Sequence, residues 1–229
     1  MSTFQGRYVM QKEDKTTASA LLHRLPSLLE LGGKKVMDEA LATLKDQPLG
    51  ESAELSSSFA WTHFITELDC SGQNLSRLDL SPYPNLLELW CGHNDLSQLD
   101  LSHTPRLNIL YCENNALSAL DLTHTPELKW LDCRENYLTK LDVRSTPHLS
   151  ELRCDSNQIT ELNMTHTTKL LSVYCAENRL AELDLSRTPN LRVLYCYGNK
   201  LPEIDCSITP ELKWLCDQES GRVMIHRRQ

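Results

Sequence analysis

The sequence predicts an α/β repeat solenoid: a horseshoe-shaped stack of short coils with a parallel β-sheet along its concave side and a helical N-terminal cap. Two observations lead to this prediction. A pattern of leucines returns along most of the chain, and a fixed period of about 20–50 residues is the mark of a repeat architecture. Cysteines also recur at a strict spacing of twenty-one residues, at Cys70, Cys91, Cys112, Cys133, Cys154, Cys175 and Cys196.

Seven consecutive units occupy residues 65–211, and an eighth begins and breaks off. Their shared pattern is L-x-x-L-x-C-x-x-N-x-L-x-x-L-D-L-S-x-T-P-x, as in the third unit, LNILYCENNALSALDLTHTPE. This pattern resembles the leucine-rich repeat L-x-x-L-x-L-x-x-N/C-x-L, with cysteine in place of the third leucine. It is most similar to bacterial repeats of the internalin type that carry a cysteine ladder. The resemblance implies the horseshoe fold and says little about function, because this fold serves many partners.

Alternation of apolar and polar residues assigns each position of a unit to a face. In the third unit, positions four and six are Leu110 and Cys112, which point inward from a short strand. Ile109, Tyr111 and Glu113 at positions three, five and seven point outward. Stacked repeats place such strands parallel and in register. The Leu-Asp-Leu at positions fourteen to sixteen predicts a second extended segment on the convex side, and the final Thr-Pro predicts a turn.

The repeated cysteines and asparagines are interpreted as structural. The chain has nine cysteines, an odd count, and no visible secretory signal, which favours free thiols packed as small core residues. One thiol per coil cannot surround a tetrahedral metal ion, so neither a metal nor another cofactor is expected. A buried amide at position nine can bond the backbone of its own coil and of the neighbouring coil. These amides are Asn94, Asn115, Asn136, Asn157, Asn178 and Asn199.

The two ends lack the repeat. Residues 1–64 are predicted to form a mostly helical cap, because TTASALLHRLPSLLELGG and KKVMDEALATLKDQ space their apolar residues at helical intervals. The first fifteen residues are predicted to be a frayed strand or disordered. We assign residues 65–215 to the repeats and 216–229 to a short C-terminal cap and tail, in which GRVMIHRRQ predicts a final strand.

Composition and motifs argue against several classes of function. A net charge of −8 disfavours unspecific binding to nucleic acid or to anionic lipid. No apolar run is long enough to span a membrane, and the start lacks a secretory signal. We therefore expect a cytoplasmic protein, or an effector translocated into a host cell. No phosphate-binding loop, zinc-protease or serine-hydrolase motif is present, so an enzyme is not expected.

Two alternatives stay open at this point. An enzyme could use the 1–64 region or Cys216, which falls at an outward position of the broken eighth unit. A fragment of a surface adhesin would require an export signal outside this sequence.

The outward strand positions carry the strongest functional signal. Three of the four tryptophans and four of the seven tyrosines lie at positions three, five and seven. Aromatic residues and arginine dominate the hot spots of protein interfaces. The competing explanation is that strands favour aromatic residues, which stack on one another. The candidate partner-binding residues are Trp90, Tyr111, Trp130, Arg153, Tyr174, Tyr195, Tyr197 and Trp214.

Charge on this face is unbalanced. Positions three, five, seven and eight carry ten acidic residues, against only Arg134 and Arg153. A protein partner with a basic patch and apolar or aromatic anchors would complement such a face, although acidic residues also keep a surface soluble. The sequence therefore predicts a non-catalytic protein-binding module acting as an effector, an adaptor or an inhibitor of a basic protein. It leaves the partner's identity and the oligomeric state open.

Overall fold

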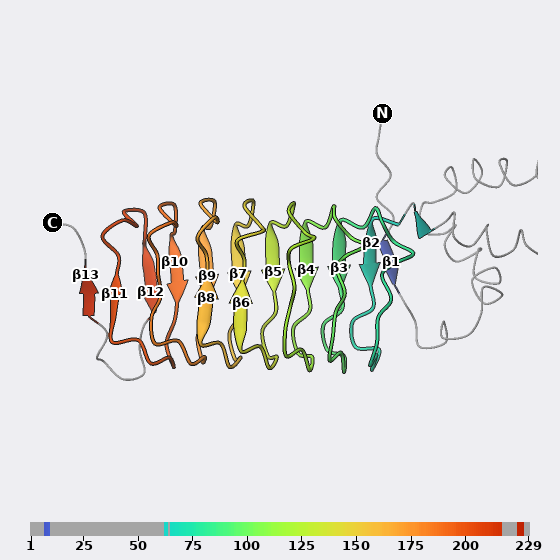
Figure 1. Cartoon of the computed structure of the whole chain (residues 1–229), viewed down its shortest axis with the longest axis horizontal. Helices are drawn as coiled ribbons and strands as arrows, with labels where there is room; N and C mark the ends of the chain where they lie inside the picture. Colours follow the sequence, from blue (N-terminus) through green and yellow to red (C-terminus); the bar gives the residue numbers. More distant parts are fainter. Residues whose placement is uncertain (1–6, 10–61, 64, 217–223, 227–229) are drawn as a thin grey trace, which may run out of the picture.

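A computed structural model describes residues 7–9, 62–63, 65–216 and 224–226 of the chain. These residues form a solenoid of short coils stacked along the long axis of the molecule (Figure 1). The predicted helical cap over residues 1–64 lies almost wholly outside the described residues, and so does most of the predicted tail. Among the residues described, no helix is long and apolar enough to cross a membrane.

One long side of the solenoid is a nine-stranded sheet in which all neighbouring strands are parallel. Within the repeats, each strand pairs with the strand twenty-one residues further on, as Leu89 pairs with Leu110. Equivalent positions of successive units therefore lie side by side. In sheet order the strands are β1 (Arg7–Val9), β2 (Glu67–Asp69), β3 (Glu88–Trp90), β4 (Ile109–Tyr111), β5 (Trp130–Asp132), β7 (Glu151–Arg153), β9 (Ser172–Tyr174), β10 (Val193–Tyr195) and β12 (Trp214–Cys216).

The opposite side of the coils carries the second extended segment that the Leu-Asp-Leu pattern predicts. There β6 (Lys140–Asp142) pairs with β8 (Glu161–Asn163), and β11 (Glu203–Asp205) pairs with β13 (Met224–His226). The alternation is confirmed in the third unit, where Leu120 and Leu122 are buried and Asp121 is exposed.

Both ends of the chain contribute a strand that the repeat period cannot place. β1, from the first fifteen residues, pairs with β2 and extends the nine-stranded sheet at the edge of the first repeat. The predicted final strand is β13, which joins β11 on the opposite side instead of continuing the large sheet. The broken eighth unit also supplies a strand, β12, which pairs with β10.

The core of each coil is built from leucine and cysteine. Leu110 and Cys112 are fully buried, and the eight cysteines of the described repeats from Cys70 to Cys206 are all buried and outside any disulfide. Burial raises the pKa of the Cys70 thiol to about 12 and also raises the pKa of Cys91, Cys112, Cys133, Cys154 and Cys175, because a thiolate would lose its hydration. The prediction that these thiols serve as small core residues is confirmed.

The asparagines form the predicted ladder between coils. The amide oxygen of Asn115 accepts the Leu96 N–H at 3.0 Å. Its nitrogen donates to the Cys91 carbonyl of the preceding coil at 3.0 Å and to the Cys112 carbonyl of its own coil at 3.1 Å. The same bonds recur at the equivalent asparagines, for example at Asn157 and Asn178. These amides are therefore part of the scaffold.

The structure also contains a row of buried threonines, whereas the sequence pattern predicts only a turn at Thr-Pro. The threonine is fully buried in five units and 3% exposed in a sixth. Its hydroxyl donates to the carbonyl three residues earlier, as from Thr146 to Val143 at 2.8 Å. Each buried hydroxyl thereby closes the turn that returns the chain to the sheet. These threonines are Thr104, Thr125, Thr146, Thr167, Thr188 and Thr209.

Position eight, just after each strand, adopts a left-handed backbone in seven successive units. Glycine occupies it at Gly72 and Gly198, with φ of 64° and 67°. Five other units place a residue with a Cβ there, at a cost of about 1–2 kcal/mol each. Those residues are His93, Asn114, Glu135, Ser156 and Glu177.

Candidate functional site

The solvent-facing side of the nine-stranded sheet brings six of the eight predicted binding residues together. We call this surface, made by positions three, five and seven of the repeats, the sheet face. In β4 the middle residue, Leu110, is fully buried, whereas Ile109 and Tyr111 on either side are half-buried. Because strands lie about 4.8 Å apart and in register, side chains at one position can touch across neighbouring coils.

Six side chains from six successive strands of the sheet stack into one continuous row. The rings of Trp90 and Tyr111 have centroids 6.2 Å apart and an interplanar angle of 8°, and Tyr111 lies 6.2 Å from Trp130. At the other end, Tyr174 and Tyr195 stack at 5.0 Å with an angle of 11°. We call this set the aromatic row; its members are Trp90, Tyr111, Trp130, Arg153, Tyr174 and Tyr195.

Arg153 joins the two aromatic halves of the row. Its guanidinium carbon lies 5.5 Å from the ring centre of Trp130 and 4.9 Å from that of Tyr174, within the range of cation–π attraction. Glu151 holds it in place, because the Arg153 Nε donates to a Glu151 carboxylate oxygen at 2.8 Å. The row is therefore continuous from Trp130 through Arg153 to Tyr174.

Asp132 does not lie on the surface as its outward position predicts. It is 1% exposed, and Arg134 binds it with Nε at 2.8 and 3.0 Å and with Nη2 at 2.8 Å. The guanidinium neutralises the carboxylate, which makes its burial tolerable. Trp130, from position three of the same strand, occupies the row between Tyr111 and Arg153 instead.

Glu113 occupies a niche on the sheet face. Its carboxylate lies directly over Gly92 of the preceding coil, where a Cβ would fall 2.3 Å from Oε1 and 2.5 Å from Cδ. One oxygen, Oε2, is buried without a hydrogen-bond partner. Burial raises the pKa of Glu113 and the nearby Asp132 raises it further, while a hydrogen bond from the backbone of Glu113 and the neighbouring His93 and Arg134 lower it.

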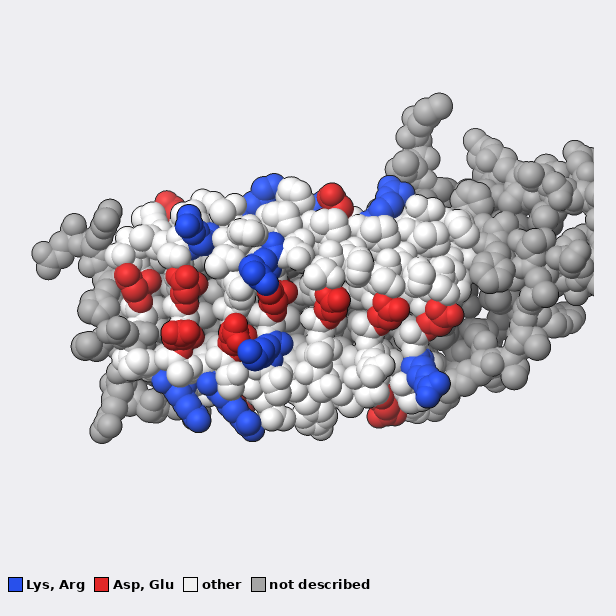
Figure 2. Space-filling model, in the orientation of Figure 1, with Lys and Arg blue, Asp and Glu red and all other residues white. Residues whose placement is uncertain are grey.

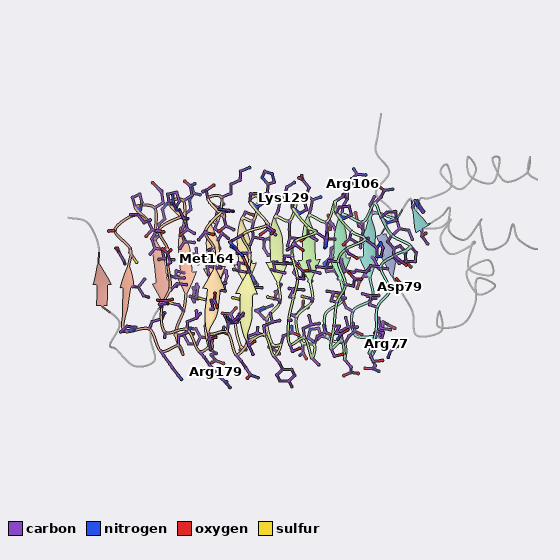
Figure 3. All side chains as sticks on the ribbon, viewed as in Figure 1. Arg77, Asp79, Arg106, Lys129, Met164 and Arg179 are labelled. Atoms are coloured by element: carbon purple, nitrogen blue, oxygen red, sulfur yellow. The ribbon has the colours of Figure 1, made fainter. Side chains whose placement is uncertain are left out.

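Several charged side chains of the sheet face interact with one another. Its two arginines are both engaged within the face, Arg134 with Asp132 and Arg153 with Glu151. Asp155 adds a carboxylate whose pKa is raised by burial, although one of its oxygens accepts the Ala176 N–H at 2.9 Å. Basic side chains labelled at the two edges of the coils, Arg106 and Lys129 at one and Arg77 and Arg179 at the other, project outward (Figure 3).

The two remaining predicted site residues, Tyr197 and Trp214, belong to the seventh and eighth units. Tyr197 is half-buried at position seven, and its backbone carbonyl accepts the Glu177 N–H at 2.8 Å. Trp214 begins β12 and pairs with Val193, but its side chain lies outside the described part of the structure. The same holds for the Cys216 side chain, so its predicted outward placement stays a prediction.

The opposite side of the solenoid presents a regular line of carboxylates (Figure 2). Each accepts the backbone N–H two residues further on, as Asp100 does from Ser102 at 2.9 Å, and these bonds lower the pKa of Asp79, Asp100 and Asp121. In the described residues no set of three or more His, Cys, Asp or Glu could hold a metal ion. We interpret these aspartates, Asp79, Asp100, Asp121, Asp142, Asp184 and Asp205, as turn-forming residues.

A shallow hollow of about 520 Å³ on this side is lined by Leu120, Asp121, Arg144 and His166, among others. Asp142 already binds Arg144 at 2.6 Å, so the hollow offers no uncompensated cation. His166 shares position eighteen of the repeat with His103 and His124; all three are exposed, and Ser145 takes this position in the unit between His124 and His166. This side therefore gives a weaker candidate site than the sheet face.

Comparison with known proteins identifies the fold. No family model and no curated protein matches the chain. Among solved structures, it is similar to the functional domain of InlJ from Listeria monocytogenes, which includes a cysteine ladder, with 28% identity and a TM-score of 0.62. That match covers 73% of this chain and 41% of the InlJ chain. This chain is a leucine-rich repeat solenoid with a cysteine ladder.

YopM structures give a second set of matches to this leucine-rich repeat protein. YopM from Yersinia enterocolitica is 26% identical with a TM-score of 0.58, over 73% of this chain and 35% of YopM. YopM from Yersinia pestis, described as a leucine-rich effector protein, is 25% identical with a TM-score of 0.61, over 72% of this chain and 45% of YopM. The chain thus spans less than half the length of each of these proteins.

Proposed function

We propose that this leucine-rich repeat protein is a non-catalytic protein-binding module whose contact surface is the aromatic row. The observation that carries the proposal is the continuity of that row, in which half-buried side chains from six strands stack without a break. Tryptophan, tyrosine and arginine are the residues that dominate interface hot spots. Stacking also holds these side chains in place, so a partner would lose little of its binding energy to ordering them.

The charge of the sheet face supports a partner with a basic patch. Both arginines of the face are already paired with its own carboxylates, and the whole chain carries a net charge of −8. Complementary charge raises the rate of association and selects among partners. The same excess of negative charge disfavours nucleic acid as the ligand.

The similarity to a leucine-rich effector of Yersinia pestis supports an effector delivered into a host cell as the biological setting. An adaptor or inhibitor of a basic protein in the cytoplasm would use the same surface in the same way. A pull-down with mass spectrometry, from the source cell and from host-cell extract, names the partner in either setting.

The contact surface is tested by changing the row on both sides of Arg153. The double variant Trp130→Ala/Tyr174→Ala removes the two rings that flank its guanidinium. We expect the affinity for the identified partner to fall by more than about a hundredfold, as for hot-spot residues, when measured by calorimetry. Each ring also contributes about 0.5–1.5 kcal/mol of contact energy to the fold, so circular dichroism must show that the variant is folded.

Tyr137→Ala is the matched control, because Tyr137 lies in the same repeat as Trp130 but is 58% exposed and outside the row. It should leave the affinity within about twofold of the unchanged protein, as expected for a surface residue outside the hot spot. If the folded double variant binds the partner as tightly as Tyr137→Ala does, the aromatic row is not the contact surface.

A further inference from the structure

The Glu113 carboxylate lies in a space left by Gly92, the glycine at position seven of the second unit. Position seven carries a side chain in the other units of the described repeats, such as Ser71, Arg134 and Asp155, whereas the second unit has Gly92. The structure assigns no positive φ to Gly92, so the backbone conformation does not require glycine there. Its missing side chain instead makes room for the Glu113 carboxylate, whose atoms lie within 3 Å of where the Cβ would be.

The carboxylate in this niche lacks a close counter-charge. Oε2 is buried without a partner, and His93 Nε2 stands 3.8 Å from Oε1 on a side chain that is 62% exposed. Arg134, on the other side, already forms a bidentate pair with Asp132. The titratable groups around Glu113 are Cys91 and His93 on the preceding coil, Tyr111 and Cys112 on its own coil, and Asp132 and Arg134 on the following coil.

We propose that Glu113 is a proton-linked anchor for a lysine or arginine side chain of the protein partner. This inference rests on the proposed function of the sheet face. Because Oε2 itself is buried, an incoming cation would reach the carboxylate through the exposed part of the Glu113 side chain, which is 21% exposed, and supply the counter-charge that the carboxylate lacks. Its aliphatic stem would pack along Tyr111, which stacks on Trp90 at the start of the aromatic row. An aromatic face beside a carboxylate attracts a cation more than either group does alone.

Binding at this anchor releases a proton when the pH is near the pKa of Glu113 in the free protein. Burial raises this pKa, so near it a fraction of the free protein carries a protonated carboxyl at Glu113. A cation binds the ionised form, so binding lowers the pKa of Glu113 and expels the proton into solvent. Affinity is therefore constant well above the pKa of the free protein and falls as the pH drops through it.

The test uses octalysine as the probe and octalysine acetylated on every Nε as its uncharged control. Binding is measured by calorimetry at low ionic strength, while carbon-13 NMR follows the Glu113 carboxyl in a pH titration. We expect octalysine to bind at least about tenfold more tightly than the acetylated peptide, and to lower the pKa of Glu113. Glu113→Gln should weaken octalysine binding about tenfold and remove its pH dependence.

Two further variants separate the anchor from the general charge of the face. Glu67→Gln removes a carboxylate of the same face at β2 and should change octalysine binding no more than about twofold. Gly92→Ala fills the niche and displaces Glu113 toward solvent, which should move its pKa back toward the ordinary value and shift the pH dependence of binding to lower pH.

The inference is overturned if Glu113→Gln binds octalysine with the affinity and pH dependence of the unchanged protein, or if octalysine leaves the pKa of Glu113 where it was. Failure of the proposed function looks different. If Trp130→Ala/Tyr174→Ala loses the native partner while Glu113→Gln keeps it at every pH, the anchor alone is wrong. If the row variant keeps the partner, the contact surface is wrong, and octalysine then decides whether Glu113 binds cations at all.

Discussion

Replacing Asn136 with aspartate tests whether the asparagine ladder holds the coils together. Asn136 is 5% exposed, and its amide oxygen accepts the Leu117 N–H of the preceding coil at 3.0 Å. Its nitrogen donates to the carbonyls of Cys112, Cys133 and Arg134 at 3.0, 3.2 and 3.1 Å. Aspartate has nearly the same shape and keeps the acceptor, but it replaces the donor with an oxygen that faces three carbonyl oxygens.

The expected loss of stability follows from these contacts. A buried charge left without its partner costs about 3–5 kcal/mol. Asn136→Ala should cost about 3 kcal/mol by a different route, since it leaves the Leu117 N–H unsatisfied and removes the bonds to the carbonyls. A domain of this kind has a total stability of about 5–15 kcal/mol. The aspartate variant therefore loses a large share of it.

The assay is urea unfolding followed by circular dichroism at neutral pH, with the free energy of unfolding taken from the midpoint and slope. Asn108→Ala is the control in the neighbouring repeat, because Asn108 makes a single exposed side-chain bond to the Arg106 carbonyl at 3.1 Å. It should change the free energy by less than about 0.5 kcal/mol. If the free energy of unfolding of Asn136→Asp lies within about 1 kcal/mol of that of the unchanged protein, the asparagine side chains do not join the coils as we argue.

The remaining predictions concern the turn, the niche and the thiols. Glu135→Gly should raise the free energy of unfolding by about 1 kcal/mol in urea titration, because Glu135 holds a φ of 52°. Gly198→Ala should lower the free energy of unfolding by about 1 kcal/mol or more, because φ is 67° and the new Cβ would meet the Glu177 backbone at 3.2 Å. If Glu135→Gly and Gly198→Ala change the free energy of unfolding in the same direction, this reasoning is wrong. The raised pKa of Glu113 in the folded state destabilises the fold as pH rises through that pKa. Glu113→Gln should therefore melt higher than the unchanged protein at neutral pH and lose this advantage once the pH falls below the ordinary carboxyl pKa, whereas a constant difference would argue against a buried ionised carboxyl. Cys133→Asp should unfold the stacked coils, because it lowers the free energy of unfolding by more than about 3 kcal/mol. A native-like circular dichroism spectrum of this variant would show that the side chain at position 133 is not buried.

The sequence predicts the scaffold well because every unit repeats the same pattern of apolar and polar residues. The inward placement of Leu110 and Cys112, the amide ladder through Asn115 and the second extended segment at Leu120 all follow from alternation inside one unit and are confirmed. Repetition makes each of these assignments testable several times over in a single chain. The buried threonines, such as Thr125, were missed because a hydroxyl beside proline in a polar stretch looks like an ordinary surface turn.

The candidate site is harder to read from sequence, because its members differ from one unit to the next. The outward direction of Trp90, Tyr111 and Tyr174 could be assigned from position alone. The depth of Asp132 could not, since it depends on Arg134 folding back to pair with it. Whether these side chains contact a partner stays a prediction.

By itself, the sequence determined the period, the parallel register and which residues face the core, because these depend on alternation within a coil and on identical neighbours. Only the tertiary structure decided how unlike neighbours share the space on the sheet face. In the aromatic row, Trp130 takes the place expected for Asp132, and the Glu113 carboxylate lies over Gly92. The tertiary structure also paired β1 and β13, which lie outside the repeat, with different sheets. Period predicts contacts between equivalent positions, whereas contacts between non-equivalent ones depend on side-chain size and charge in three dimensions.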